Sequence, residues 1–102
     1  PHLYSRTKFF SGEFAAVLAK FDRAIVTPIY PSREEPMPGV DSGLIVDEAR
    51  RSGATHVELV NDMAAVPAHL APSLREGDVV LVLGAGNINK MAAPLLDEVR
   101  KR

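Results

Sequence analysis

The chain has 102 residues, of which 46% are apolar and 25% charged, and this composition is typical of one globular domain rather than of a disordered or coiled-coil segment. It contains no cysteine, which excludes a disulfide scaffold, a thiolate metal site and a cysteine nucleophile. A formal net charge of −1 gives no electrostatic reason to expect nucleic acid or an anionic membrane as a partner, and no apolar run is long enough to span a bilayer.

The first part of the chain predicts a helix and then a strand. The chain begins at Pro1 without an initiator methionine or the features of a signal peptide, so we expect a fragment of a longer protein. Apolar residues recur at helical spacing and predict a helix over residues 7–20; they are Phe10, Phe14, Val17, Leu18 and Phe21. A nearly continuous apolar run from Ala24 to about Tyr30 then predicts a strand that is covered on both faces.

The middle of the chain predicts a loop, a helix and a second strand. Residues 31–40 are rich in proline and form the predicted loop. Asp41 or Ser42 can cap the helix that follows, and Gly53 marks its end. Residues 56–60 are apolar enough to form the second strand.

The last part of the chain predicts two more helices around a third strand. The first of these helices is short, and we expect it to be kinked or broken because Pro67 and Pro72 fall inside its pattern. Residues 78–83 form the clearest predicted strand of the chain. Residues 84–87 then turn into a helix that begins near residue 88.

The alternation of helix and strand predicts the fold class. It indicates an α/β fold, with a three-layer Rossmann-like open parallel sheet, helices on both faces and right-handed crossovers. Such a pattern normally starts with a strand. We expect that strand to precede Pro1 and to be missing from the fragment, which would leave a gap or an open edge in the sheet.

Three segments of the chain fall at the carboxyl ends of the predicted strands, where open α/β sheets bind their ligands. The first is the N-terminal segment, which contains His2 and Arg6. An arginine offers paired donors to a carboxylate or phosphate, and a histidine adds another donor. The alternative is the solvated start of a helix, with Arg6 exposed.

The second segment is the loop after the first strand, which holds Arg33, Glu34 and Glu35 among prolines. Prolines stiffen a loop and so reduce the conformational entropy that is lost when it holds a small ligand. This predicts a ligand-contacting loop. The alternative is a charged turn on the surface.

The third segment is the glycine turn at Gly84 and Gly86, between a predicted strand and a predicted helix. Glycines let a ligand approach the backbone, and a helix start offers free N–H groups to an anion. The dinucleotide fingerprint is incomplete, however, and no phosphate-loop motif is present, which disfavours a nucleotide site. His56 and His69 have no partner at metal-ligand spacing, so we expect no metal site and no self-contained catalytic set.

Three phrases of the sequence together resemble a known family. Residues 1–7 are similar to its P-H-R-Y-T-R-T segment, residues 34–42 to its E-E-P-I-P-G-x-D-S loop, and residues 77–88 to its G-D-x-x-x-x-x-G-A-G-D-I segment. Their order and spacing agree over essentially the whole chain. The chain therefore resembles the C-terminal domain of the UDP-N-acetylmuramate–L-alanine ligases, in the Mur ligase family.

The resemblance implies a function for a larger enzyme. That enzyme is cytoplasmic and ATP-dependent, and it joins L-alanine to UDP-N-acetylmuramic acid through an acyl phosphate in peptidoglycan synthesis, with magnesium. Residues 1–102 would be its third domain, which closes over the site, and the nucleotide-sugar and ATP-binding domains would lie upstream. The resemblance further implies that this domain alone binds neither ATP nor magnesium and is inactive.

The resemblance also assigns roles to single residues. His2 and Arg6 match the family's carboxylate-contacting histidine and second arginine, and Leu3 stands where many members have another arginine. The loop from Tyr30 to Glu35 corresponds to the region where sister ligases recognise their amino acid. The glycine turn at residues 84–86 matches the turn that faces the closed site.

Two other classes of function stay open at this point. One is a free-standing binding module with a flavodoxin-like sheet, for a small ligand such as a nucleotide or for a protein partner. The other is a structural fragment that dimerises through the edge left by the missing strand. The coding sequence upstream of Pro1 separates the ligase domain from the free-standing module.

Overall fold

The computed structural model describes residues 1–31, 33–84 and 88–101 of the chain. These residues form two compact units, residues 1–61 and residues 62–102, and each unit is described by itself below. Within the described ranges no helix is long and apolar enough to cross a membrane.

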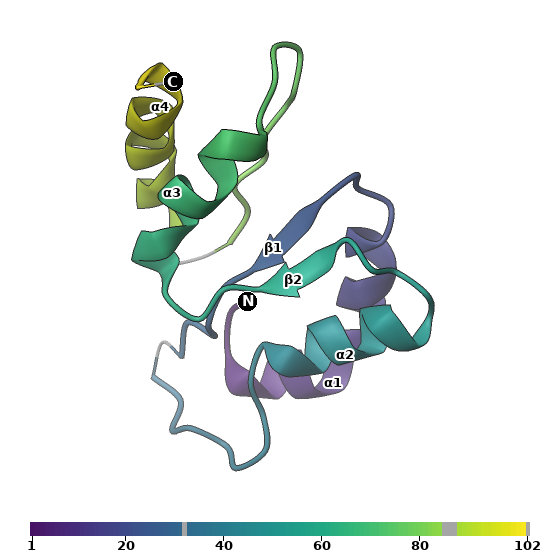
Figure 1. The fold of residues 1–102 in the computed structure, drawn as a ribbon. Helices are drawn as coiled ribbons and strands as arrows, with labels where there is room; N and C mark the ends of the chain where they lie inside the picture. Colours follow the sequence, from purple (N-terminus) through teal and green to yellow (C-terminus); the bar gives the residue numbers. More distant parts are fainter. Residues whose placement is uncertain (32, 85–87, 102) are drawn as a thin grey trace. The chain divides into compact units, whose positions relative to one another are not determined.

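The first unit alternates two helices with the two strands of a small parallel sheet (Figure 1). Its elements are α1 (Tyr4–Leu18), β1 (Ala24–Val26), α2 (Gly43–Arg51) and β2 (Val57–Leu59). The strands pair with Ala24 opposite Val57 and Val26 opposite Leu59. In Figure 1 α1 and α2 lie together on one side of the two strands. An α/β class with a parallel sheet is therefore confirmed for this unit.

Small and β-branched apolar side chains make up the core of the first unit. They come from both helices, both strands and the turn after α2, and they are Ala15, Ala24, Val26, Ile45, Val46, Ala49, Ala54 and Val57. Leu18, Ala19 and Leu59 pack against this cluster and are partly buried. Alanines on both helices allow the two backbones to approach closely.

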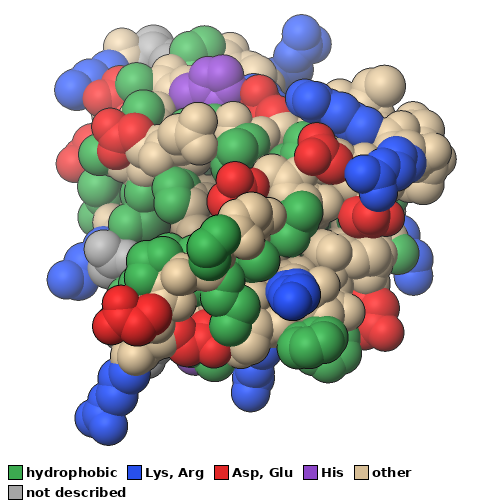
Figure 2. Space-filling view, turned by 90° about the horizontal axis from the view of Figure 1, so that it is seen from below, with side chains coloured by type: hydrophobic (Ala, Val, Ile, Leu, Met, Phe, Trp, Pro, Cys, Tyr) green, Lys and Arg blue, Asp and Glu red, His purple; other side chains and the backbone are tan. Residues whose placement is uncertain are grey.

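Helix α1 confirms the predicted helix, but it buries a different face from the one that its large apolar residues indicate. Its buried residues are Thr7 and Ala15. Phe10, Phe14 and Val17 are 45%, 38% and 53% exposed, whereas Ala15 lies in the core that both helices share. Figure 2, seen from the side on which α1 and α2 lie in Figure 1, shows apolar side chains at the surface among charged ones.

The second unit contains short helices that the prolines interrupt. It consists of η1 (Met63–Ala65), α3 (Val66–Leu70), η2 (Ala71–Ser73), η3 (Ile88–Met91) and α4 (Ala92–Arg100). The predicted break is confirmed, because Pro67 lies in the first turn of α3 and Pro72 in that of η2. The carboxylate of Asp62 accepts a hydrogen bond from the backbone N–H of Ala64 and so caps the start of η1.

The prediction of a third strand over residues 78–83 is wrong for this structure. These residues form no strand, and the side chains of Val79 and Leu83 are 84% and 66% exposed. A strand requires a neighbour that pairs with its N–H and C=O groups, and the second unit has no strand among its described residues. The turn predicted over residues 84–87 lies outside the described residues from 85 to 87.

Candidate functional site

The N-terminal segment lies beside the loop that follows β1. The N–H of Tyr30 donates to the carbonyl of Pro1, and the N–H of Leu3 donates to the carbonyl of Tyr30, both over 2.8 Å. His2 and Tyr30 thereby form a parallel bridge, and their rings stack with centroids 5.9 Å apart. The structure thus joins the first two segments that the sequence predicts as ligand-binding.

The turn from this bridge into α1 is strained and firmly held. Leu3 has φ of 65° and ψ of 136°, a conformation that L-residues with a side chain rarely adopt. Its carbonyl accepts hydrogen bonds from the N–H of Thr7 at 3.2 Å and from the hydroxyl of Thr7 at 3.0 Å. Thr7 is fully buried, so this anchor for Leu3 belongs to the packed interior.

The first turn of α1 receives its cap from a distant loop. Leu3, at the N-cap position, provides no side-chain hydrogen bond, and the first turn contains no acidic residue. Instead, the N–H of Ser5 donates to one carboxylate oxygen of Glu34 at 3.1 Å, and the hydroxyl of Ser5 donates to the other at 2.6 Å. A carboxylate is well placed there, because helix N-termini carry free N–H donors and positive partial charge.

The environment of Glu34 favours its ionised form. The hydrogen bond from the Ser5 hydroxyl, then the one from the Ser5 backbone, lowers the pKa of Glu34 below its ordinary value of 4.5. The backbone of Tyr4 and the charge of His2 lower this pKa further. The N–H of Glu34 also donates to the carbonyl of Pro31 at 3.0 Å, which closes a turn in the loop.

The other predicted residues of this unit lie near these contacts in sequence and face solvent. Arg6 follows Ser5 in the first turn of α1, and its side chain is exposed. Arg33 and Glu35 flank Glu34 and are exposed as well. The structure therefore brings together residues 1–6 and the described residues of the loop, 30–31 and 33–35, through backbone and side-chain hydrogen bonds.

The predicted glycine turn belongs to the second unit. Gly84 has a φ of 151°, and a Cβ at this position would lie 2.8 Å from Cγ2 of Ile88. A side chain at residue 84 would thus meet both an unfavourable backbone conformation and a close contact. Gly86 lies outside the described residues.

Sequence reasoning missed the part that two serines play. No local spacing signals the bond from Ser5 to Glu34, because a capping box places its acid within the same helix. Ser42 was a candidate cap for α2, yet its buried hydroxyl donates to the carbonyl of Thr27. The carboxylate of Asp41 instead accepts a hydrogen bond from the N–H of Gly43, at 2.7 Å.

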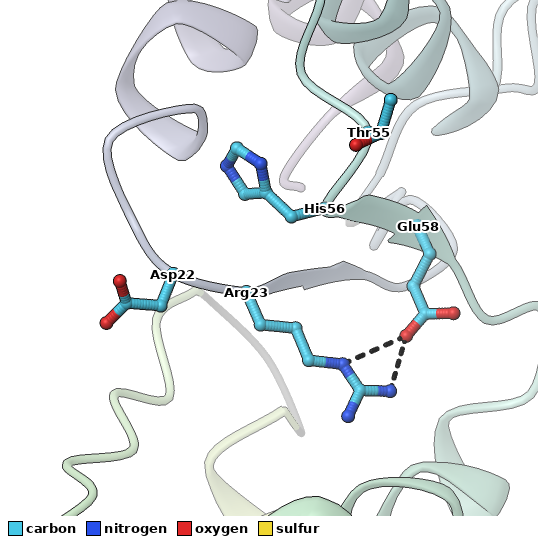
Figure 3. A pocket seen from close by; sticks show the side chains of 5 residues that line it. All are labelled: Asp22, Arg23, Thr55, His56 and Glu58. Carbon is cyan, nitrogen blue, oxygen red and sulfur yellow. Dashed lines mark hydrogen bonds and ion pairs between the residues drawn. The ribbon is translucent and has the colours of Figure 1, made fainter.

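A shallow pocket of about 280 Å³ opens at the opposite ends of the strands, where β1 and β2 begin (Figure 3). It is lined by Asp22, Arg23, Thr55, His56 and Glu58. Nε and an Nη of Arg23 donate to one carboxylate oxygen of Glu58 at 3.3 and 2.7 Å. Nε2 of His56 lies 3.0 Å from the carbonyl oxygen of Ala19. Because ligands of such sheets bind at the carboxyl ends of strands, we place the candidate site at residues 1–6, 30–31 and 33–35 instead.

Comparisons with known proteins decide the family. The family described as "Mur ligase, glutamate ligase domain" matches residues 2–86. The chain belongs to the Mur ligase family. The resemblance to the Mur ligase C-terminal domain is therefore confirmed over most of the chain.

Three curated relatives of this Mur ligase domain are each named UDP-N-acetylmuramate–L-alanine ligase. A relative from Streptomyces coelicolor is 46% identical over 99% of the chain, and one from Streptomyces griseus is 43% identical over 97%. A relative from Mycolicibacterium smegmatis is 41% identical over 98% of the chain. The chain spans 22%, 21% and 20% of the length of these three relatives.

Proposed function

We propose that this Mur ligase domain is the third, C-terminal domain of a cytoplasmic ligase that joins L-alanine to UDP-N-acetylmuramic acid. The identity of 46% with a ligase of that name, over 99% of the chain, carries the proposal. In the proposed enzyme the upstream domains bind the nucleotide sugar and ATP. A free-standing flavodoxin-like module is disfavoured, because this relative carries the domain as 22% of a longer chain.

In the proposed reaction the amino group of L-alanine becomes bonded to the muramyl carboxyl carbon through an acyl phosphate, and ADP and phosphate are released. ATP supplies the phosphoryl group with magnesium in the upstream domains. Within the described part of this chain, no three histidine, aspartate or glutamate side chains gather as metal ligands. The proposal assigns the phosphoryl and metal chemistry to the upstream domains.

The domain's own part is to bind and orient the amino acid. His2 and Arg6 offer donors to a carboxylate, and the bridge between His2 and Tyr30 fixes the backbone that carries them. Arg33, Glu34 and Glu35 belong to a loop that several prolines stiffen. A site that assembles only after substrate binding would protect an acyl phosphate from water.

The glycine turn and the larger sheet are part of the same proposal. Gly84 and Gly86 stay in the proposal as substrate-binding residues, because the absence of a side chain lets a ligand approach the backbone. The finer fold we propose is a three-layer Rossmann-like sheet that a strand preceding residue 1 completes. The apolar side chains of residues 79–83 are exposed, and exposing apolar surface to water is unfavourable, which supports a larger sheet that covers them.

The proposal is tested by L-alanine-dependent phosphate release from UDP-N-acetylmuramic acid and ATP in the full-length protein. Arg6→Ala is expected to lower kcat/KM by about 30- to 1,000-fold, because it removes a charge-assisted contact in a closed site. Arg50→Ala, on the exposed side of α2, is the matched control and should leave the rate unchanged.

Each outcome bears on a different part of the proposal. Absence of alanine-dependent release in the wild-type protein would overturn the ligase assignment. Turnover that Arg6→Ala leaves intact would keep the ligase and remove Arg6 from the site. Alanine-dependent release by the isolated 102-residue chain would show that the upstream domains are not required.

A further inference from the structure

The first turn of α1 contains Arg6 and follows His2, the two candidate carboxylate-binding residues, but no side chain of its own caps it. Its N-cap residue, Leu3, is apolar and has positive φ, and no acidic residue follows in the turn. The free N–H groups of a helix start need acceptors. Glu34 provides them from 29 positions further along the chain.

Both carboxylate oxygens of Glu34 are engaged by one residue. The N–H and the hydroxyl of Ser5 each bind a different oxygen, at 3.1 and 2.6 Å. Two bonds to separate oxygens fix the orientation of the carboxylate relative to the helix, which a single bond does not. Since Ser5 directly precedes Arg6 and lies two residues beyond Leu3, these bonds hold the turn between His2 and Arg6.

We propose that Glu34 is a positioning residue that acts through Ser5: it holds the first turn of α1 and thereby sets the places of His2 and Arg6 for the carboxylate of the amino acid. The inference rests on the proposed function for the identity of the ligand. It changes the role expected of Glu34, from a group that contacts substrate to one that orders the groups that do.

Ordering His2 and Arg6 before the ligand binds reduces the conformational entropy that binding would otherwise cost. Arg6 is exposed and has a long, flexible side chain, so fixing its backbone reduces the entropy lost on binding. His2 is held independently on its other side by the bridge to Tyr30. Loss of the Glu34 bonds should therefore leave the fold and the bridge in place while the spacing between His2 and Arg6 becomes variable.

The experiment compares four variants in the full-length protein by steady-state kinetics with L-alanine. Ser5→Ala and Glu34→Ala should each raise the KM for L-alanine by about tenfold or more, since small displacements of binding groups are costly. The double variant should be no worse than either single variant, because the two residues act as one unit. Glu34→Gln should retain most of the affinity, since a glutamine amide can bond both the N–H and the hydroxyl of Ser5 without charge.

Two matched controls and one rescue separate positioning from stability. Glu13→Ala and Ser11→Ala lie further along α1, outside the candidate site, and should leave the KM unchanged. Ser5→Thr keeps the hydroxyl and should restore the wild-type KM, whereas a variant that is merely less stable would lower the amount of active enzyme, and so kcat, at an unchanged KM. In the 102-residue chain, the amide resonance of Ser5 should titrate with a carboxyl group in the wild type and not in Glu34→Ala.

Three results would overturn the inference. If Glu34→Gln is as damaging as Glu34→Ala while Ser5→Ala is harmless, Glu34 contacts the substrate by its charge. If the effects of the two single variants add in the double variant, the residues act separately. If neither variant changes the KM, the bonds have no role in binding. An inactive wild-type protein would instead overturn the proposed ligase, and the Ser5 titration would still test the contact.

Discussion

Ser5 and Glu34, 29 positions apart in sequence, are joined by two hydrogen bonds that use both carboxylate oxygens. This pair fixes the loop after β1 to the start of α1, and the bridge between His2 and Tyr30 adds a second link between the same two segments. Each link restrains the other, because a shift of the loop would have to break bonds at both points. The candidate site is therefore built on two crossing segments rather than on one flexible terminus.

The Ser5–Glu34 pair predicts an acid-sensitive step in the stability of the chain. Hydrogen bonds from Ser5 lower the folded-state pKa of Glu34 below 4.5, so its stabilising effect is fully present above that pH. It should be lost as the pH falls from about 4.5 through the lowered pKa, because protonation then weakens the bonds. The charge of His2, which also lowers this pKa, acts in the same direction.

The measurement is the thermal unfolding midpoint of the 102-residue chain between pH 7 and pH 2. The difference in midpoint between the wild type and Glu34→Ala should shrink as the pH falls below 4.5. Glu13→Ala, which removes an exposed carboxylate from α1 itself, should show a smaller difference that depends less on pH. If the unfolding midpoint of the wild type stays above that of Glu34→Ala by a constant amount down to pH 2, the loss of stability in acid does not come from Glu34.

The strained turn at Leu3 predicts an unusual preference for glycine. At φ of 65° and ψ of 136° a Cβ is unfavourable, whereas glycine adopts such angles freely. Leu3→Gly should therefore be more stable than Leu3→Ala by about 1 kcal/mol, although glycine is normally the less stable of the two. Both variants lose the leucine side chain, so their difference isolates the backbone, and chemical unfolding of the two chains measures it. An alanine variant that is the more stable one would show that Leu3 relaxes at little cost.

Local patterns in the sequence predicted elements whose stability depends on near neighbours. The periodicity of residues 7–20 indicated α1, although not the face that α1 buries, and the run from Ala24 indicated β1. The same reasoning failed at residues 78–83. An apolar run can show that a segment is able to pair, but it carries no information on whether a partner strand is present.

The sequence predicted only part of the candidate site, because some of its contacts depend on partners that are distant in sequence. His2, Tyr30 and Glu34 could be named as candidates, because residue type and the position after a strand are local features. The bonds from Ser5 to Glu34 depend on how two segments that are distant in sequence pack together, and residue spacing in the sequence carries no information on that packing. The backbone angles of Leu3 follow from the same crossing, and leucine has no preference for positive φ that could have signalled them.

Two glycines predict opposite effects of the same substitution. Gly12 lies within α1 with open space where a Cβ would be, so Gly12→Ala should stabilise the chain by about 1 kcal/mol. Gly84 has a φ of 151°, and its Cβ would approach Ile88 to 2.8 Å, so Gly84→Ala should destabilise by about 1 to 3 kcal/mol. Thermal unfolding of both variants provides the comparison. Equal effects of the two substitutions would contradict the backbone conformation at residue 84.

The bond from Ser42 to Thr27 predicts that its removal lowers the stability of the chain and loosens the loop between β1 and α2. The Ser42 hydroxyl is buried and donates to the carbonyl of Thr27, and Thr27 is itself only 6% exposed. Ser42→Ala leaves that carbonyl without its partner, so unfolding free energy should fall by about 1 to 3 kcal/mol. Ser52→Ala is the matched control, since Ser52 is exposed at the other end of α2, and it should lower the unfolding free energy by less.

The same substitution also predicts a change in hydrogen exchange. Because Ser42 fixes the far end of the loop that carries Glu34, exchange at the Ser5 amide should become faster in Ser42→Ala and stay unchanged in Ser52→Ala. A destabilised Ser42→Ala chain with normal exchange at Ser5 would show that the loop holds Glu34 without help from its second anchor.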